Sequence, residues 1–443
     1  ATAGIPAAVA DLYVASGGDN GNSGTNWAQT FRSVSKALSV VQEGSRIHLA
    51  AGTYSNGWET FPLPMTKYGQ QLLGAGAAAT VLDGEGSEQR VLDLTDAAFG
   101  RVEDLTIRNG GTNAAFKGGG SGLYVGNADE LWIASCSVVS NRCGRDGGGI
   151  YAVGCADLVV TNCLISGNTI DIYDRDWDRR GGGMVAYSSS GLVVDSMVTG
   201  NRTFNIRHGS SNTRSGGGGL AFSDGAWRVL RTVVSRNACE AAGSDYLTKR
   251  GGGILVVNGT HEFQNCLVVT NNAMGTWGTE AGEGDGICVL NGNVVLLNVT
   301  LADNLGEGLR RVAGTVGVTN TILWANGDDI VEPTLPSGVT LAYSCVQDGD
   351  GAGVNECVSV DPLFADTTYY HLQSRAGHYR DGYFGGGSWA VASPSSPLID
   401  RGDPRTPYRD EPTPNGLRAN MGAYGGTPVA SRSSGMALLF TIR

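Results

Sequence analysis

An alternation of apolar and polar positions recurs seven times through the middle of the chain. Each copy holds a position that is most often Cys, Ser or Thr, then a spacer, an aliphatic residue, two spacers and an asparagine. The asparagines are Asn141, Asn168, Asn201, Asn237, Asn271, Asn304 and Asn326. The aliphatic residues three positions earlier are Val138, Ile165, Val198, Val234, Val268, Leu301 and Leu323. One buried face per short segment predicts a β-strand in every copy.

A second register consists of glycine triplets, each followed by a short apolar segment. The triplets begin at Gly118, Gly147, Gly181, Gly216 and Gly251, and Gly284-Asp285-Gly286 is a variant. They recur every 29 to 35 residues. A period of this length indicates stacked supersecondary units, with glycines at the corners.

The two registers together predict a solenoid of parallel strands. We expect each asparagine to occupy a corner, because asparagine tolerates left-handed backbone angles and its amide can bond to the same group one coil away. Equivalent residues would then stack about 4.8 Å apart, the spacing of neighbouring strands. On this interpretation the asparagines and glycines are scaffold.

An asparagine corner followed by Gly-Gly-Gly and an apolar strand resembles bacterial right-handed parallel β-helix proteins. This is the architecture of pectate-lyase-like enzymes and of many adhesins. The resemblance covers about residues 45–345. It implies an all-β fold, a single-stranded right-handed parallel β-helix with an N-terminal helical cap and an irregular C-terminal segment.

Both ends of the chain fit this resemblance. Residues 1–44 contain Asp11-Leu12-Tyr13-Val14 and a segment whose apolar residues share one helical face, and that helix would cap the open core. The residues of that face are Phe31, Val34, Ala37, Leu38 and Val41. Residues 346–443 resemble the closing segment of secreted, largely uncharacterised β-helix proteins of environmental bacteria. The aspartates of this segment and Arg418 fit either a polar cap network or a ligand site.

Composition narrows the possible partners and location. Of 443 residues, 69 are glycine, 41% are apolar and 16% are charged, which excludes collagen and polar disorder. The net charge of −11 argues against nucleic acid as a partner. No apolar run reaches the roughly 18 residues of a membrane-spanning helix. The start, Ala1-Thr2-Ala3-Gly4, suits a mature chain after signal removal, and the resemblance implies a secreted or cell-surface protein.

Nine cysteines are present. Cys136, Cys163 and Cys266 occupy the same repeat position, which favours small apolar side chains stacked in the core. Cys345 and Cys357 flank a turn-rich segment and are the expected disulfide. A cysteine zinc site is not expected, because no Cys-x-x-Cys pair occurs.

Variable insertions lie between the asparagine corners and the next triplets, at residues 169–180, 202–215, 238–250 and 272–283. Two positions before successive triplets stand Arg145, Arg179, Arg214 and Lys249. We expect these to form a column of positive charge, which something must compensate. The compensation is either the acidic residues of the same loops or an anionic polymer bound by arginine forks.

The insertions also carry candidate ligands of other kinds. Their aromatic residues can stack on sugars or cover the flank of the solenoid, namely Tyr173, Trp177, Phe204, Tyr246 and Trp277. A closely spaced run of carboxylates is a candidate Ca²⁺ site, although it lacks the glycine and terminal glutamate of an EF-hand loop. Its members are Asp171, Asp174, Asp176 and Asp178.

Two functions stay open at this stage. The favoured one is a structural or adhesive protein that contacts polysaccharide or its own copies. The apolar residues 436–443 either pack on the last coil or add as a strand to the edge of a neighbouring subunit. The alternative is a lyase that cleaves a uronic-acid polymer by β-elimination, which needs a base and positive charge near the sugar carboxylate. Suitable residue types for that chemistry are Arg179, Arg214, Lys249 and His208.

Overall fold

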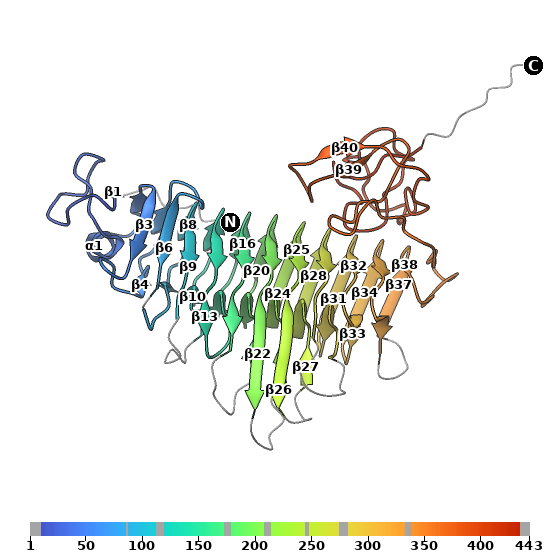
Figure 1. Cartoon of the computed structure of the whole chain (residues 1–443), viewed down its shortest axis with the longest axis horizontal. Helices are drawn as coiled ribbons and strands as arrows, with labels where there is room; N and C mark the ends of the chain where they lie inside the picture. The colour runs from blue at the N-terminus through green and yellow to red at the C-terminus, as the bar shows by residue number, and fades with distance from the viewer. Residues whose placement is uncertain are drawn as a thin grey trace, which may run out of the picture.

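The computed structural model describes residues 10–85, 87–111, 119–171, 179–207, 214–243, 248–273, 282–332 and 338–434. The polypeptide winds as a solenoid of short parallel strands, and an irregular segment folds back over one side of its C-terminal half (Figure 1). The predicted fold class, a parallel β-helix with a small N-terminal helix and an irregular C-terminal segment, is confirmed.

Sheet A contains twenty strands because most coils contribute two to it. These strands are β1 (Asp11–Val14), β2 (Arg46–Leu49), β4 (Leu63–Pro64), β5 (Gln71–Leu73), β7 (Leu92–Thr95), β8 (Arg101–Glu103), β10 (Leu123–Gly126), β11 (Trp132–Ala134), β14 (Ile150–Val153), β15 (Leu158–Thr161), β19 (Met184–Tyr187), β20 (Gly191–Val194), β24 (Leu220–Leu230), β28 (Ile254–Gln264), β30 (Ile287–Val289), β31 (Asn293–Leu297), β33 (Glu307–Arg311), β34 (Thr315–Thr319), β36 (Asp328–Val331) and β37 (Val339–Ala342). The eleven-residue β24 and β28 run continuously through both positions of their coils, which joins the two faces into one sheet.

Sheet B takes one strand from each coil. Its strands are β3 (Gly52–Ser55), β6 (Thr80–Asp83), β9 (Thr106–Arg108), β12 (Ser137–Val139), β16 (Leu164–Ser166), β21 (Met197–Thr199), β25 (Val233–Ser235), β29 (Leu267–Val269), β32 (Thr300–Ala302), β35 (Ile322–Trp324) and β38 (Cys345–Val346). The inward aliphatic residue of each middle strand is fully buried, as the alternation predicts, for example Val138, Ile165 and Val198.

The insertions form two short loop sheets on the side of the solenoid that faces away from the C-terminal segment (Figure 1). One consists of β13 (Arg142–Cys143), β17 (Thr169–Ile170), β22 (Arg202–Arg207) and β26 (Ala238–Gly243). The other consists of β18 (Arg179–Arg180), β23 (Arg214–Gly216) and β27 (Thr248–Arg250). The C-terminal segment adds the antiparallel hairpin β39 (His378–Arg380) and β40 (Ser388–Ala390).

The helix α1 (Val34–Val40) lies at the N-terminal end of the solenoid, and all five residues of its predicted apolar face are buried. Its first turn is capped twice. The Ser33 hydroxyl accepts from the Lys36 amide, and the buried Glu59 carboxylate accepts from the Val34 and Ser35 amides at 2.7 and 2.8 Å. The capping carboxylate also suits the positive end of the helix dipole.

The seven asparagines form a ladder along the solenoid, and all but the last, Asn326, are buried. The side-chain amide of Asn168 donates to the backbone carbonyl of Val138 at 2.8 Å and to Oδ1 of Asn201 at 2.9 Å. Its own Oδ1 accepts from the backbone and side chain of Asn141. The same side-chain contact recurs from Asn141 through to Asn326, so each coil in this part of the solenoid is held to the next at one defined residue.

The backbone geometry of this corner differs from our expectation. The left-handed residue is the one before each asparagine, as at Ser140, Arg236 and Thr270, with φ of 56°, 54° and 56°. The asparagine is selected for its two-sided amide, because the position is buried and each hydrogen-bonding group there needs a partner.

Glycine is required in the triplets because neighbouring coils leave no room for a side chain and because one residue of each turn has a left-handed backbone angle. Gly147 has φ of +68°, and a Cβ on Gly149 would lie 2.6 Å from the carbonyl oxygen of Gly183. The register differs from the sequence count in two coils. The left-handed glycine that opens each turn is Gly120, Gly147, Gly181, Gly217 or Gly251, so two turns begin at Gly120 and Gly217, not at Gly118 and Gly216.

All nine cysteines are free and buried, so the predicted Cys345–Cys357 disulfide is wrong. The thiol of Cys345 donates to the carbonyl of Val360, and that of Cys357 to the carbonyl of Asn355. Burial raises the pKa of Cys163, Cys239 and Cys266 to about 12, which leaves almost no reactive thiolate at neutral pH.

Replacing Asn201 by Ala should destabilise the solenoid by roughly 3–5 kcal/mol, because it removes four hydrogen bonds and leaves buried groups without partners. Asn293→Ala is the control, since Asn293 is exposed and accepts one bond from Thr315. Urea denaturation followed by circular dichroism measures both. Equal, small effects in the two variants would contradict the ladder's role.

A thiol-reactive chromophore should modify less than one cysteine per native chain within minutes and all nine in guanidinium chloride, because burial keeps the thiols protonated and inaccessible. Absorbance of the released chromophore gives the count. Recovery of seven thiols in denaturant without reductant would indicate that a disulfide forms after all.

Candidate binding cleft

The predicted charge column does not have the register that we expected. In the strand pairing, Arg179 lies opposite Ser215, and Ser215 lies opposite Lys249. Arg214 pairs with Thr248 instead, one residue away from that row. The cause is the run of four glycines from Gly216 to Gly219, of which only the last three form the turn.

The residues of the predicted column and loops have different environments. Arg145 is exposed, whereas Lys249 is only 7% exposed. The side chains of Arg179 and Arg214 lie outside the described residues. The other loop candidates that lie outside them are Tyr173, Asp174, Asp176, Trp177, Asp178, His208, Tyr246 and Trp277. Their roles therefore stay predictions.

Ion pairs between successive coils compensate much of the charge at the base of the insertions. Arg142 binds Asp171 at 2.6 Å, and Arg202 binds Glu240 at 2.5 Å. Further along, Arg250 binds Glu283. The described residues hold no group of three or more His, Cys, Asp or Glu side chains that could bind a metal ion. Asp171, the described member of the predicted Ca²⁺ run, forms its ion pair with Arg142.

Sheet B is covered over its C-terminal half by the closing segment. The outward side chains of β25, β29 and β32 pack against an aromatic cluster. The members of that cluster are Phe364, Tyr370, Tyr379, Tyr383, Phe384 and Tyr424. A second cluster joins Ile322 of β35 to Leu372, Leu398 and Met421. Apolar burial on this scale fixes the segment to the solenoid.

A second column of side chains fastens the closing segment to the solenoid by hydrogen bonds. It occupies the left-handed turn between sheets A and B, where Asn265, Asn298 and Asn320 have φ of 53°, 52° and 53°. The Asn265 amide donates to the carbonyls of Ala423 and Gly425 at 2.9 and 2.8 Å. The amide of Asn298 donates to two further carbonyls of the same stretch, and Oδ1 of Asn320 accepts from the Asp403 amide.

The polar groups proposed for the closing segment bond largely within it. Asp400 accepts from the Gly416 amide and the Ser433 hydroxyl, while Arg418 donates to the carbonyls of Gly402 and Arg401. Buried Glu411 accepts from the amides of Asn420 and Gly426 through Oε1, and its Oε2 has no hydrogen-bond partner among the described residues. Burial raises the pKa of Glu411 to about 7.

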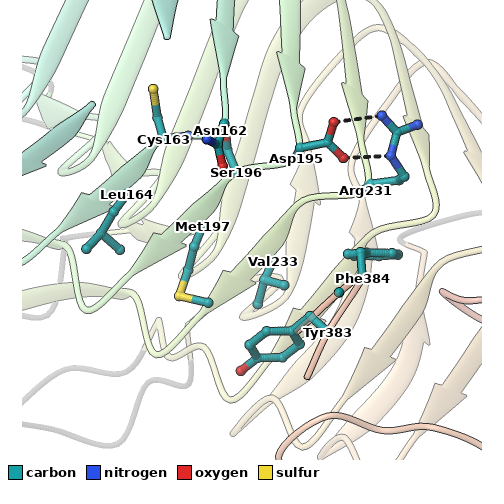
Figure 2. A pocket seen from close by; sticks show the side chains of 11 residues that line it. Asn162, Cys163, Leu164, Asp195, Ser196, Met197, Arg231, Val233, Tyr383 and Phe384 are labelled. Atoms are coloured by element: carbon teal, nitrogen blue, oxygen red, sulfur yellow. Dashed lines mark hydrogen bonds and ion pairs between the residues drawn. The ribbon is translucent and has the colours of Figure 1, made fainter. Parts of the chain in front are cut away.

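A cleft of about 550 Å³ lies on sheet B at the edge of the area that the closing segment covers (Figure 2). Its floor is the outward side of β16, β21 and β25, at Leu164, Met197 and Val233. Tyr383 and Phe384 overhang it from the loop between β39 and β40. Leu164 is 36% exposed, so apolar surface stays open to solvent here.

Polar groups line the cleft from the same left-handed column that fastens the closing segment. The column continues through Asn162, Asp195 and Arg231, with φ of 52°, 50° and 42°. Arg231 and Asp195 form a two-pronged ion pair, with Nε to Oδ1 at 2.6 Å and Nη2 to Oδ2 at 2.8 Å (Figure 2). The hydrogen bonds to Asp195 raise the pKa of Arg231, which keeps it charged.

We did not predict this cleft from the sequence, although a signal for it is present there. The residue after the small repeat position should face solvent, yet it is apolar in four successive coils, at Leu164, Met197, Val233 and Leu267. A run of outward apolar residues indicates a covered or ligand-binding surface. The aromatic residues that complete the cleft come from a segment more than one hundred residues later, which no local pattern connects to it.

Family comparison agrees with this architecture. Residues 94–283 match the family described as the right-handed β-helix region, and residues 15–172 match "Protein of unknown function (DUF1565)". The chain is a right-handed parallel β-helix protein. A comparison with curated proteins finds no match.

Solved structures of similar shape include the pectate lyase Pel9A, with a TM-score of 0.56 and 14% identity over 94% of this chain and 96% of that one. A rhamnogalacturonan lyase gives a TM-score of 0.43 and 13% identity over 82% and 92%. XylC in complex with xylose gives 0.49 and 9% over 84% and 91%. At these identities the similarity to Pel9A shows the fold alone. Within the described residues, no helix has the length and apolar character to span a membrane.

The closing segment should be held more tightly at pH 5–6 than at pH 8–9. Because the folded-state pKa of Glu411 is raised above its unfolded value, stability is lost as the pH rises through about 7, by at most about 3 kcal/mol. Thermal unfolding and limited proteolysis of the full chain across this range measure the effect. Glu411→Gln should flatten it, and an unchanged pH profile in that variant would rule out Glu411 as the cause.

Proposed function

We propose that this protein is a secreted or cell-surface β-helix protein with a structural or adhesive role, and that it binds polysaccharide in the cleft between sheet B and the loop joining β39 to β40. The observation that carries the proposal is the cleft itself, in which apolar, aromatic and hydrogen-bonding side chains converge on one open volume.

The lining suits the two kinds of surface on a sugar. The C–H faces of a sugar ring are apolar and can pack on Tyr383 and on the aliphatic floor, while its hydroxyls both donate and accept hydrogen bonds. Asn162, Asp195 and Arg231 offer groups of both kinds along one edge. The volume lies within the roughly 300–1,000 Å³ of typical ligand pockets.

A comparison with the closing segment supports this use of the column. In three coils, asparagines of the column bind polar groups of a chain that lies across sheet B. In the three coils of the cleft, the same positions lie beside open space instead of that chain. A polysaccharide is also a long chain with polar groups along its edge, and it would extend the same mode of contact.

Binding without cleavage is the function that the described residues favour. A β-elimination base must be able to accept the sugar C5 proton, whereas Arg231 is held charged by Asp195 and Lys249 is buried. The lyase stays as the alternative, with Arg179, Arg214 and His208 as its candidates. Incubation with uronic-acid polymers, with and without calcium, tests it by the ultraviolet absorbance of the unsaturated product.

Two further parts of the proposal concern location and assembly. The nine free thiols are buried, so oxidants in solvent do not reach them, and they are compatible with an oxidising exterior. Self-assembly through residues 436–443 rests on sequence alone, since these residues lie outside the described part. Electron microscopy of the intact chain and of a chain lacking them tests assembly, and the absence of filaments from both would refute it.

Tyr383→Ala should weaken binding to an immobilised polysaccharide about tenfold, because it removes the aromatic wall of the cleft. Trp58→Ala is the control, since Trp58 is an exposed aromatic at the N-terminal end. Affinity electrophoresis against β-glucan, xylan, mannan, polygalacturonate and alginate gives the comparison. If the two variants lose binding equally, the cleft is not the site.

A further inference from the structure

The charges around the cleft point to a class of ligand. We infer that the cleft selects neutral polysaccharides over uronic-acid polymers, an inference that rests on the proposed function. Among the eleven residues that line the cleft, Asp195 and Arg231 are the two with charged side chains, and they pair with each other.

The pairing removes the positive charge that an anionic sugar would need. A carboxylate binds arginine best through two parallel N–H groups. Arg231 already presents Nε and Nη2 to the two oxygens of Asp195 in that arrangement. A uronic acid could reach only the remaining Nη hydrogens of Arg231, and there it would lie beside the Asp195 carboxylate, whose charge repels it, so anionic ligands are disfavoured.

Charges beyond the lining do not reverse this balance. Burial raises the pKa of the Tyr383 hydroxyl, and of the two oppositely charged groups near it Arg236 lowers that pKa whereas Asp366 raises it. The whole chain carries a net charge of −11, which repels a polyanion at long range in low salt.

A neutral sugar can use the pair as it stands. Arginine has five N–H donors and Asp195 takes two of them, so others remain for ring hydroxyls. Each carboxylate oxygen keeps a further acceptor site. Both side chains are more than 40% exposed, which makes these groups accessible from the cleft. In addition, the Asn162 side chain donates to Ser135, and its Oδ1 has no donor among the described residues.

The wild-type chain gives the first test. Isothermal titration or affinity electrophoresis at low salt should show at least tenfold tighter binding to one neutral polysaccharide than to polygalacturonate or alginate. Equal or tighter binding to the uronic-acid polymers would overturn the neutral selection and leave the proposed function standing. No binding to any polymer would refute the proposed function itself.

The variant Asp195→Asn gives the second test. It keeps the side-chain shape and releases Arg231, so the ratio of polygalacturonate binding to neutral binding should rise at least tenfold, and 0.5 M NaCl should abolish the rise. Glu103→Gln is the matched control, because Glu103 forms a similar two-pronged pair with Arg101 on β8 and the charge change is the same. An equal rise in both variants would show an effect of net charge and would overturn the role of the pair, as would no rise in Asp195→Asn.

Discussion

The buried asparagine ladder is the interaction on which the rest of the structure depends. Strands of three or four residues have few hydrogen bonds with which to fix their register, and a slip by one residue would exchange their inner and outer faces. The ladder excludes such slips, since each side-chain amide must meet both a backbone carbonyl and the next asparagine inside a dry corner. The stacked aliphatic core, the loop positions and the outward columns all take their register from it.

A second column, in the turn between sheets A and B, turns this regular scaffold into a specific surface. Its asparagines bind the closing segment in three coils, and its members Asn162, Asp195 and Arg231 border open space in three others. The cleft therefore lies where the closing segment no longer covers sheet B but the column of polar side chains continues. Scaffold and site are built from the same repeated turn.

The fold could be predicted from the sequence because its determinants are local and repeated. The aliphatic alternation, the asparagine period and the glycine corners each repeat in many coils and indicate the same structural unit. The apolar face of the N-terminal helix could be predicted from five positions close together in the sequence. The predictions that were wrong concerned single residues at which one coil differs from the others or at which the backbone geometry is not visible in the repeat. Four glycines in place of three shifted Arg214 out of the row, and the left-handed angle belongs to the residue before each asparagine. The cleft depends on Tyr383 and Phe384, whose approach to Met197 and Val233 is set by the tertiary fold of the closing segment.

On our proposal, a sugar chain lies across β16, β21 and β25 beneath the loop between β39 and β40. A crystal structure of the full chain soaked with a neutral oligosaccharide tests it most directly. We expect a sugar ring against Tyr383, with hydroxyls within hydrogen-bond distance of Asp195 or Arg231. An oligosaccharide bound along the insertion loops, with the cleft holding only water, would contradict it.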